Sequence, residues 1–379
     1  MNGNIRFDER SGVRSLKFLI DILRPAHVHF FHHFIRECEQ AGNRVLVTAR
    51  RQDLATELLE AYGHPYQVIH SPRDNGMDLV WELLLRNRFL QDLVHRERPD
   101  LMLGVVGISI AAVGKKMGIP AIVFCDTEAS LVSNWLTFPR AKEVITPRSF
   151  TKKVRGNHVT YPGYHELAYL HPNRFTPDPA IRRVLGIAPE ERFSIVRFVS
   201  WSASQDFFQR GFSPDGKRRL VEALLGRGPV FVSAEGALPP EFEALRLKIP
   251  PLLVHHAIAA ADLLVGESAT MASEAAVLGT PAVSLFPVGK GFTGEEERRY
   301  GLVCNVRTEA EAITAAEGFL DRQDQEAARA ERAEKRRRLL EENVDVTGWI
   351  LDHLGIHREM ALPERAPGIP EGRLALMPA

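Results

Sequence analysis

The chain is 379 residues long, more than one ordinary hydrophobic core accommodates, which predicts two domains. Lys plus Arg and Asp plus Glu number 48 each, and this zero net charge argues against a general nucleic-acid-binding protein while it leaves room for a local basic site. The three cysteines are odd in number and widely spaced, which predicts reduced thiols in a cytoplasmic protein instead of a disulfide framework.

The first 15 residues are polar and contain no apolar stretch of the kind found in a signal peptide. From Leu16, short apolar runs alternate with longer amphipathic ones. The apolar runs predict strands at 15–23, 44–49, 66–70, 101–106 and 121–125, and the amphipathic runs predict helices at 29–40, 54–61, 77–96 and 108–117. This alternation is typical of βαβ units around a parallel sheet covered on both faces. Residues 1–155 are therefore predicted to form a Rossmann-like domain.

The second half repeats this organisation after an interruption. Residues 156–190 are rich in proline and aromatic residues, which predicts an interdomain linker. Strands are predicted at 193–199, 230–234, 263–266, 282–286 and 302–306, so residues 191–340 form a second Rossmann-like domain. The charged run 325–344 and the segment 347–355 predict one long surface helix, and residues 341–379 are assigned to a C-terminal helix and tail. Two such sheets place a ligand cleft at the carboxyl ends of their strands.

One stretch, VGESATMASEAAVLGTP at 265–281, carries the clearest functional signal. It runs from a strand end into a helix that begins with small and hydroxyl residues: Gly266, Ser268, Ala269 and Thr270. A helix start favours anions because its first N–H groups lack partners, so these residues are predicted to bind a diphosphate. Glu274, on the same helix face as Thr270, is predicted to hold the ribose hydroxyls. The alternative is that Ser268 only caps a closely packed helix and that Glu274 is solvated.

This motif resembles the donor-nucleotide motif of GT-B glycosyltransferases and of the non-hydrolysing UDP-N-acetylglucosamine 2-epimerases. In those proteins a Ser-Gly-Gly run binds the diphosphate and a later Glu binds the ribose; Ala269 and Thr270 stand here in place of the glycines. With FLIDILRPAHVHFFHHFI, VLVTAR, FCDTEAS and VRFVSWSAS, residues 16–355 are similar to DUF354, a family of predicted glycosyltransferases. The resemblance implies an α/β protein of the GT-B fold, with two Rossmann-like doubly wound domains facing a central cleft.

The histidine-rich segment RPAHVHFFHH follows the first predicted strand. Helical spacing turns Val28 and Phe31 toward the core, leaves His27 at the junction of loop and helix, and places His29 and His33 on a polar face. Two histidines four residues apart can chelate a metal, but the sequence shows no Cys or HExxH partner for them. No metal site is therefore predicted.

Several catalytic roles follow from the resemblance. AHV here resembles the GHV of inverting GT-B enzymes, which implies that His27 is a general base, and Asp126, at a neighbouring strand end, is predicted to orient it. The alternative is that His27 caps its helix or binds phosphate and that Asp126 caps the next helix. The match to the epimerases implies a phosphate contact by Arg24 and proton transfer by Asp126 and Glu128.

Across the predicted cleft, Arg197, Ser200 and Ser202 are predicted to contact phosphate or acceptor. The resulting hypothesis is a cytoplasmic glycosyltransferase of polysaccharide biosynthesis that moves a sugar from a nucleotide-diphosphate donor, a UDP-sugar, to an unknown acceptor hydroxyl. It uses no metal and no cofactor besides the donor, and binds no nucleic acid. No apolar run approaches the roughly 20 residues of a membrane span, which is compatible with peripheral membrane contact. A UDP-N-acetylglucosamine 2-epimerase-like isomerase and a non-catalytic nucleotide-sugar binding protein are the alternatives, and the oligomeric state is left open.

Overall fold

The structure is a computed structural model that describes residues 15–50, 53–69, 78–128, 131–198, 211–234, 238–285, 291–322 and 325–356. Its described residues fall into two compact units, and each is treated by itself. The first unit contains the residues up to Tyr169 together with those from Val344 onward, and the second contains Leu170–Asn343.

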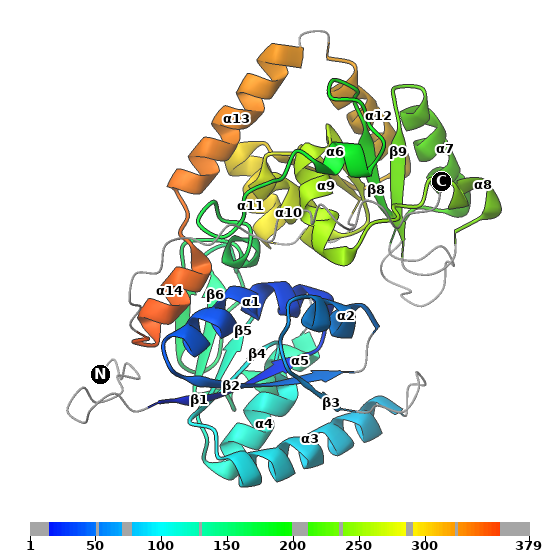
Figure 1. The fold of residues 1–379 in the computed structure, drawn as a ribbon. Helices are drawn as coiled ribbons and strands as arrows, with labels where there is room; N and C mark the ends of the chain where they lie inside the picture. Colours follow the sequence, from blue (N-terminus) through cyan, green and yellow to red (C-terminus); the bar gives the residue numbers. More distant parts are fainter. Residues whose placement is uncertain are drawn as a thin grey trace. The chain divides into compact units, whose positions relative to one another are not determined.

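The first unit is built on a seven-stranded sheet with the strand order β3-β2-β1-β4-β5-β6-β7, and every pairing is parallel. In Figure 1, helices α1 and α2 lie on one face of this sheet and α3 and α4 on the other, as a doubly wound domain requires. The strands are β1 (Lys17–Ile22), β2 (Arg44–Arg50), β3 (Gln67–Ile69), β4 (Leu101–Val105), β5 (Ala121–Phe124), β6 (Glu143–Pro147) and β7 (His158–Tyr161). The helices are α1 (Pro25–Gln40), α2 (Asp53–Ala61), α3 (Asp78–Glu97), α4 (Ile108–Met117), α5 (Leu131–Thr137), η1 (His165–Ala168) and α14 (Val346–His353).

The order of the first sheet reverses between β1 and β4, which both lie in its centre. These two strands are buried almost throughout, because helices cover both faces of a parallel sheet. The chain leaves the two strands in opposite directions across the sheet, and in folds of this type the ligand crevice lies outside the carboxyl ends at such a point. The segments that follow β1 and β4 therefore occupy the place where a ligand binds in folds of this type.

The second unit contains a five-stranded parallel sheet with the order β12-β11-β10-β8-β9. Its order reverses between β8 and β10, which puts the second crevice at the start of α10. The strands are β8 (Ser194–Phe198), β9 (Val230–Ala234), β10 (Leu263–Gly266), β11 (Ala282–Leu285) and β12 (Val303–Val306). The helices are α6 (Ile181–Val184), α7 (Pro214–Leu225), α8 (Pro240–Glu243), η2 (Pro251–Leu253), α9 (Val254–Ala260), α10 (Ala269–Leu278), α11 (Gly291–Glu295), the π-helix η3 (Glu296–Tyr300), α12 (Glu309–Leu320) and α13 (Gln325–Glu341).

Two boundaries differ from those expected from the sequence. The segment 156–190 contains strand β7, which extends the first sheet, and η1, and only from Leu170 does the chain join the second unit. The single long helix predicted near the C-terminus is two helices, α13 and α14. They are separate because Asp345 caps a new helix by accepting a hydrogen bond from Gly348 N at 3.1 Å. Helix α14 belongs to the first unit, where Thr347 donates to the carbonyl of Ala168 at 2.8 Å.

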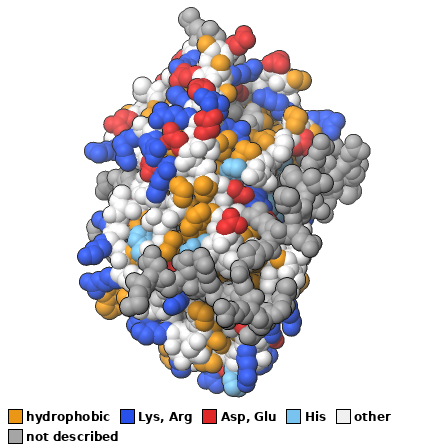
Figure 2. Space-filling model, turned by 90° about the vertical axis from the view of Figure 1, so that its left-hand side faces the viewer, with side chains coloured by type: hydrophobic (Ala, Val, Ile, Leu, Met, Phe, Trp, Pro, Cys, Tyr) orange, Lys and Arg blue, Asp and Glu red, His pale blue; other side chains and the backbone are white. Residues whose placement is uncertain are grey.

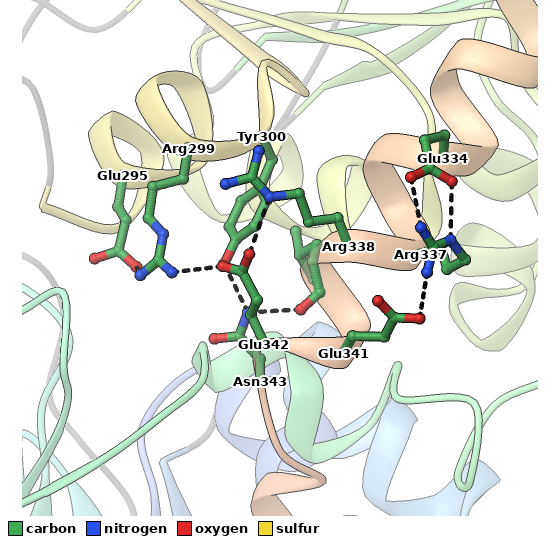
Figure 3. A network of polar contacts seen from close by, with 10 residues as sticks. Glu295, Arg299, Tyr300, Glu334, Arg337, Arg338, Glu341, Glu342 and Asn343 are labelled. Carbon is green, nitrogen blue, oxygen red and sulfur yellow. Dashed lines mark hydrogen bonds and ion pairs between the residues drawn. The ribbon is translucent and has the colours of Figure 1, made fainter.

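Ion pairs run along the exposed surface of helix α13. Arg337 pairs with Glu334 and Glu341, and Arg338 pairs with Glu342, at spacings of three or four residues (Figure 3). Figure 2 shows basic and acidic side chains interspersed on the side of the molecule where α13 lies. Among the described residues, no helix is both long and apolar enough to cross a bilayer.

Candidate functional site

The first crevice begins where β1 ends. Arg24 is the exposed N-cap residue of α1, which starts at Pro25 because proline suits the first helical position. His27 therefore lies inside the first turn of the helix and not in the preceding loop, and only 7% of it is exposed. Its Nδ1 accepts a hydrogen bond from the backbone N–H of Leu23 at 3.3 Å.

The environment of His27 keeps its imidazole neutral. Its pKa is lowered from the ordinary 6.5 to about 3, mainly by burial and then by the charge of Arg24, while the charge of Asp126 opposes both effects. A neutral imidazole whose Nδ1 accepts a hydrogen bond carries its proton on Nε2. In this tautomer Nε2 is a donor and lacks the free lone pair of a general base. The predicted roles of His27, as a base and as the partner of Asp126, stay predictions.

Asp126 has a histidine partner that the sequence did not reveal. It follows β5, and its Oδ2 lies 3.2 Å from Nδ1 of His165, on η1. Thr127 donates to the other carboxylate oxygen at 2.8 Å. His165 is 8% exposed and meets the ring of Phe30 edge-on at 4.6 Å. His165 lies in the segment that we assigned to the linker. The only feature of the sequence that pointed to a functional role was a histidine among aromatic residues.

Two further features lie at the same edge of the first sheet. Glu128 accepts hydrogen bonds from the backbone N–H of Thr151 at 3.2 Å and from its hydroxyl at 3.4 Å, so it supports the turn after β6. Val106, directly after β4, has φ of 57°, which is costly for a β-branched residue. Strained backbone of this kind is found preferentially at functional sites. Its presence supports this edge as a candidate site.

Two further histidines of α1, His29 and His32, are buried and have structural partners. His29 was expected on a polar face, and this is wrong: it is 7% exposed, and its Nδ1 lies 2.8 Å from the hydroxyl of Tyr62. His32 is buried against His64, with their ring nitrogens 2.8 Å apart. Helix α2 and the residues that follow it cover this side of α1. The spacing of residues within α1 could not predict this tertiary contact. The described residues contain no group of three or more His, Cys, Asp or Glu arranged to hold a metal.

In the second unit, α10 begins at the crevice between β8 and β10. Ser268 is its N-cap, and its hydroxyl accepts from the N–H of Met271 at 3.2 Å. Gly266 is required by packing, because a Cβ there would lie 2.2 Å from the carbonyl oxygen of Arg197 on β8. Ala269 is buried and Thr270 half-buried. The residues thus form a capped helix start at the carboxyl edge of the sheet, and their binding of phosphate stays a prediction.

Glu274 lies one turn further along α10 and is not solvated. Only 5% of it is exposed, and its Oε1 lies 3.0 Å from Nε2 of His255 on α9. His256 is also buried, and its Nδ1 accepts from the backbone N–H of Asp178 at 2.9 Å. A buried carboxylate is costly unless it is paired, so the histidine holds Glu274 in a defined orientation. The sequence did not reveal this pair, because its two members come from separate helices, α9 and α10.

Two cations lie at the same edge of the second sheet. Arg197, near the end of β8, donates from Nη1 to the hydroxyl of Ser233 at 3.0 Å. Lys217, on α7, is 3% exposed, and its ammonium lies 3.7 Å from Oε1 of Glu267. Burial lowers the pKa of Lys217 and the charge of Glu267 opposes this effect. Sequence reasoning did not identify Lys217, and the predicted contacts Ser200 and Ser202 lie outside the described residues.

A buried acid behind α10 gives a prediction on pH dependence. Glu296 is fully buried and accepts a hydrogen bond from the hydroxyl of Ser273 at 2.6 Å. Its pKa is raised from the ordinary 4.5 to about 8, mainly by burial; the hydrogen bond from Ser273 opposes this effect and the charge of Glu295 adds to it. The folded protein therefore binds a proton here that the unfolded chain releases. The stability contributed by this group is fully present below the unfolded pKa and is lost as the pH rises through the folded pKa.

We expect Glu296→Gln to remove this dependence, because glutamine keeps the shape of the acid without titrating. Between about pH 5 and pH 8 the unfolding free energy of the natural protein should fall more steeply than that of the variant, by at most about 1.4 kcal/mol per pH unit. Parallel thermal denaturation series measure the difference. Equal slopes in the two series would contradict the prediction.

The chain matches known proteins in sequence and in fold. Residues 16–204 match the family described as "Protein of unknown function (DUF354)". An uncharacterized protein of Methanocaldococcus jannaschii is 24% identical over 296 residues, which cover 72% of this chain and 82% of that protein. The UDP-GlcNAc 2-epimerase of the same organism, in complex with UDP-GlcNAc and UDP, is 13% identical with a TM-score of 0.59, over 81% of this chain and 94% of that chain. The glycosyltransferase SsfS6 of Streptomyces sp. SF2575, complexed with thymidine diphosphate, is 15% identical with a TM-score of 0.57, over 89% and 99% of the two chains.

At these identities the solved structures establish the fold. The two parallel sheets are Rossmann-like domains of the GT-B type, as the sequence motifs implied. The family match falls on the first unit, the linker and β8, which include Arg24, His27, Asp126 and His165. Over residues 16–204 the chain therefore belongs to the DUF354 family.

Proposed function

We propose that this protein is a glycosyltransferase that moves a sugar from a UDP-sugar to an acceptor hydroxyl. The observation that carries the proposal is the capped start of α10 at the carboxyl edge of the second sheet, with Glu274 buried one turn further on. Helix amides favour a diphosphate, and a fixed carboxylate accepts hydrogen bonds from ribose hydroxyls. The two solved structures of this fold described above contain UDP or thymidine diphosphate, which supports a nucleoside diphosphate as the ligand class.

The charges at this edge suit the departure of the diphosphate. Lys217 and Arg197 are positioned by Glu267 and Ser233, so they supply cationic donors that need little reorganisation when negative charge develops. The reaction we propose needs no metal ion. Turnover is therefore expected to be unchanged by an excess of EDTA, measured as UDP release with and without the chelator. A loss of turnover that Mg²⁺ or Mn²⁺ restores would contradict metal independence.

An isomerase is the second candidate, because Asp126 and Glu128 both follow β5, where a pair of acids could transfer protons to and from a sugar. Such an enzyme would eliminate and re-add the nucleoside diphosphate on one sugar without an acceptor. The structure gives these acids different partners, His165 and Thr151. The isomerase would need two acids in similar surroundings, whereas the transferase needs one base. The different partners favour the transferase, which we therefore place first.

One set of experiments separates the candidates. Calorimetric titration with UDP, dTDP and GDP tests nucleotide binding, and NMR then follows UDP-sugars with and without a mixture of sugar acceptors. A new glycosidic product supports the transferase, whereas conversion of the sugar without any acceptor supports the isomerase. Binding without either reaction identifies a nucleotide-sugar binding protein. If none of the nucleotides binds, the proposed function is wrong.

A further inference from the structure

In the first unit, His165 is a buried histidine with an unusual hydrogen-bonding environment. His165 places Nδ1 3.2 Å from the carboxylate of Asp126, while its Nε2 is buried and has no hydrogen-bond partner among the residues that the structure describes. Buried polar atoms almost always form hydrogen bonds, so an exception calls for an explanation such as a bound water, a ligand or a catalytic role. The unsatisfied atom lies beside the carboxyl end of β5, at the edge where ligands bind in this fold.

The carboxylate beside Nδ1 of His165 suits this histidine to act as a base. A carboxylate can only accept, so it holds the proton of neutral His165 on Nδ1 and leaves the lone pair on Nε2. His27 has the opposite arrangement, because its Nδ1 accepts from the backbone N–H of Leu23 and its proton is on Nε2. Of the two histidines near Asp126, only His165 therefore has a lone pair on Nε2 that can accept a proton.

The surroundings of the free nitrogen suit a hydroxyl compound. Tyr161, at the end of β7, has a ring 6.2 Å from that of His165, and its hydroxyl is also buried without a partner among the described residues. The ring of Phe30 packs edge-on against His165 and limits its rotation. Both polar groups are buried and lack a hydrogen-bond partner among the described residues, so an O–H group that reached either one could satisfy it.

We propose that His165 is the general base of the transfer reaction and that Asp126 positions it. The acceptor hydroxyl gives its proton to Nε2 of His165 while its oxygen bonds to the anomeric carbon. The bond between that carbon and the diphosphate oxygen breaks, and its electron pair leaves with the nucleoside diphosphate. The imidazolium, stabilised by Asp126, then releases the proton to solvent. This inference rests on the proposed glycosyltransferase function.

Matched substitutions test the proposal. His165→Gln, His27→Gln and His158→Gln are compared in the full chain, where His158 serves as the control because it lies on β7 and contacts Thr146. UDP release from UDP-glucose and from UDP-N-acetylglucosamine is measured with water and with added monosaccharides as acceptors. We expect His165→Gln to lower kcat by about 100- to 10,000-fold, the range for loss of a general base. The Kd for UDP should stay within about twofold, and His158→Gln should behave as the natural protein.

Asp126→Asn provides a second variant of unchanged volume in case His165→Gln folds poorly. A positioning role of Asp126 predicts that Asp126→Asn has a lower kcat with little change in KM. A base role of His165 predicts that imidazole added to the buffer partly restores the activity of His165→Gly. A merely structural role of these residues would produce neither result. If the natural protein binds UDP and releases it from a UDP-sugar, but His165→Gln keeps at least half of the natural kcat, the inference is wrong and the proposed function stands. Loss of turnover in His27→Gln alone would assign the base to His27. A natural protein that binds no nucleotide would instead refute the proposed function.

Discussion

Replacement of Asp21 by alanine is expected to lower the unfolding free energy of the first unit by about 3–5 kcal/mol. Asp21 lies on the central strand β1 and is 1% exposed. It accepts hydrogen bonds from Nε and Nη2 of Arg86 and, at 2.7 Å, from the hydroxyl of Thr48. Arg86 is itself only 4% exposed, so loss of the carboxylate leaves an uncompensated cation inside the domain. Differential scanning calorimetry should find a fall of about 6–20 °C in the transition of this unit.

An exposed ion pair supplies the control for this result. Arg337 on α13 pairs with Glu334 and Glu341, and more than half of its side chain is exposed (Figure 3). Arg337→Ala should change stability by at most about 1 kcal/mol, because solvent screens such pairs. The double variant Asp21→Leu with Arg86→Met should recover most of the stability, since it removes both buried charges. If Asp21→Ala lowers the unfolding free energy no more than Arg337→Ala does, the buried pair of Asp21 and Arg86 does not stabilise the first unit.

The second large effect concerns nucleotide binding. Glu274→Ala is expected to weaken UDP binding by about 1–3 kcal/mol, or about 5- to 150-fold, because a charged acceptor for the ribose hydroxyls is lost. Isothermal titration calorimetry with UDP measures the change. Glu241→Ala is the control, because Glu241 lies on the same unit in an exposed pair with Arg218. That variant should bind UDP as the natural protein does.

A comparison of ligands distinguishes direct contact from damage to the fold. The natural protein should prefer UDP to 2′-deoxy-UDP, because the deoxy compound offers Glu274 one hydroxyl fewer. In Glu274→Ala this preference should disappear, whereas a general loosening of α10 would weaken both ligands equally. His255→Ala should reduce the preference in part, since it removes the side chain that orients the carboxylate. A variant of Glu274 that still discriminates between the two nucleotides would exclude the ribose contact.

Much of the fold could be read from the sequence because it depends on local periodicity. The apolar runs around Phe18, Leu103 and Val265 are buried strands, and the alternation of strands with amphipathic helices specified two parallel sheets. The helix start at Ser268 was equally local, because its capping residue and its first turn are adjacent in the chain. The boundary of the first unit was less accessible, since β7 is short and half-exposed and gives a weak periodic signal.

The sequence by itself thus determined which residues reach the carboxyl edges of the two sheets, because strand ends follow from hydrophobic pattern. Only the tertiary structure decided which of these side chains contact one another. His165 reaches Asp126 because β7 adds to the edge of the first sheet, and His255 reaches Glu274 because α9 packs beside α10. These partners come from separate elements, and hydrophobic periodicity carries no information about which side chains adjoin across them. The protonation of a buried histidine likewise depends on its surroundings, so the chemistry of His27 and His165 became distinguishable only once the chain was folded.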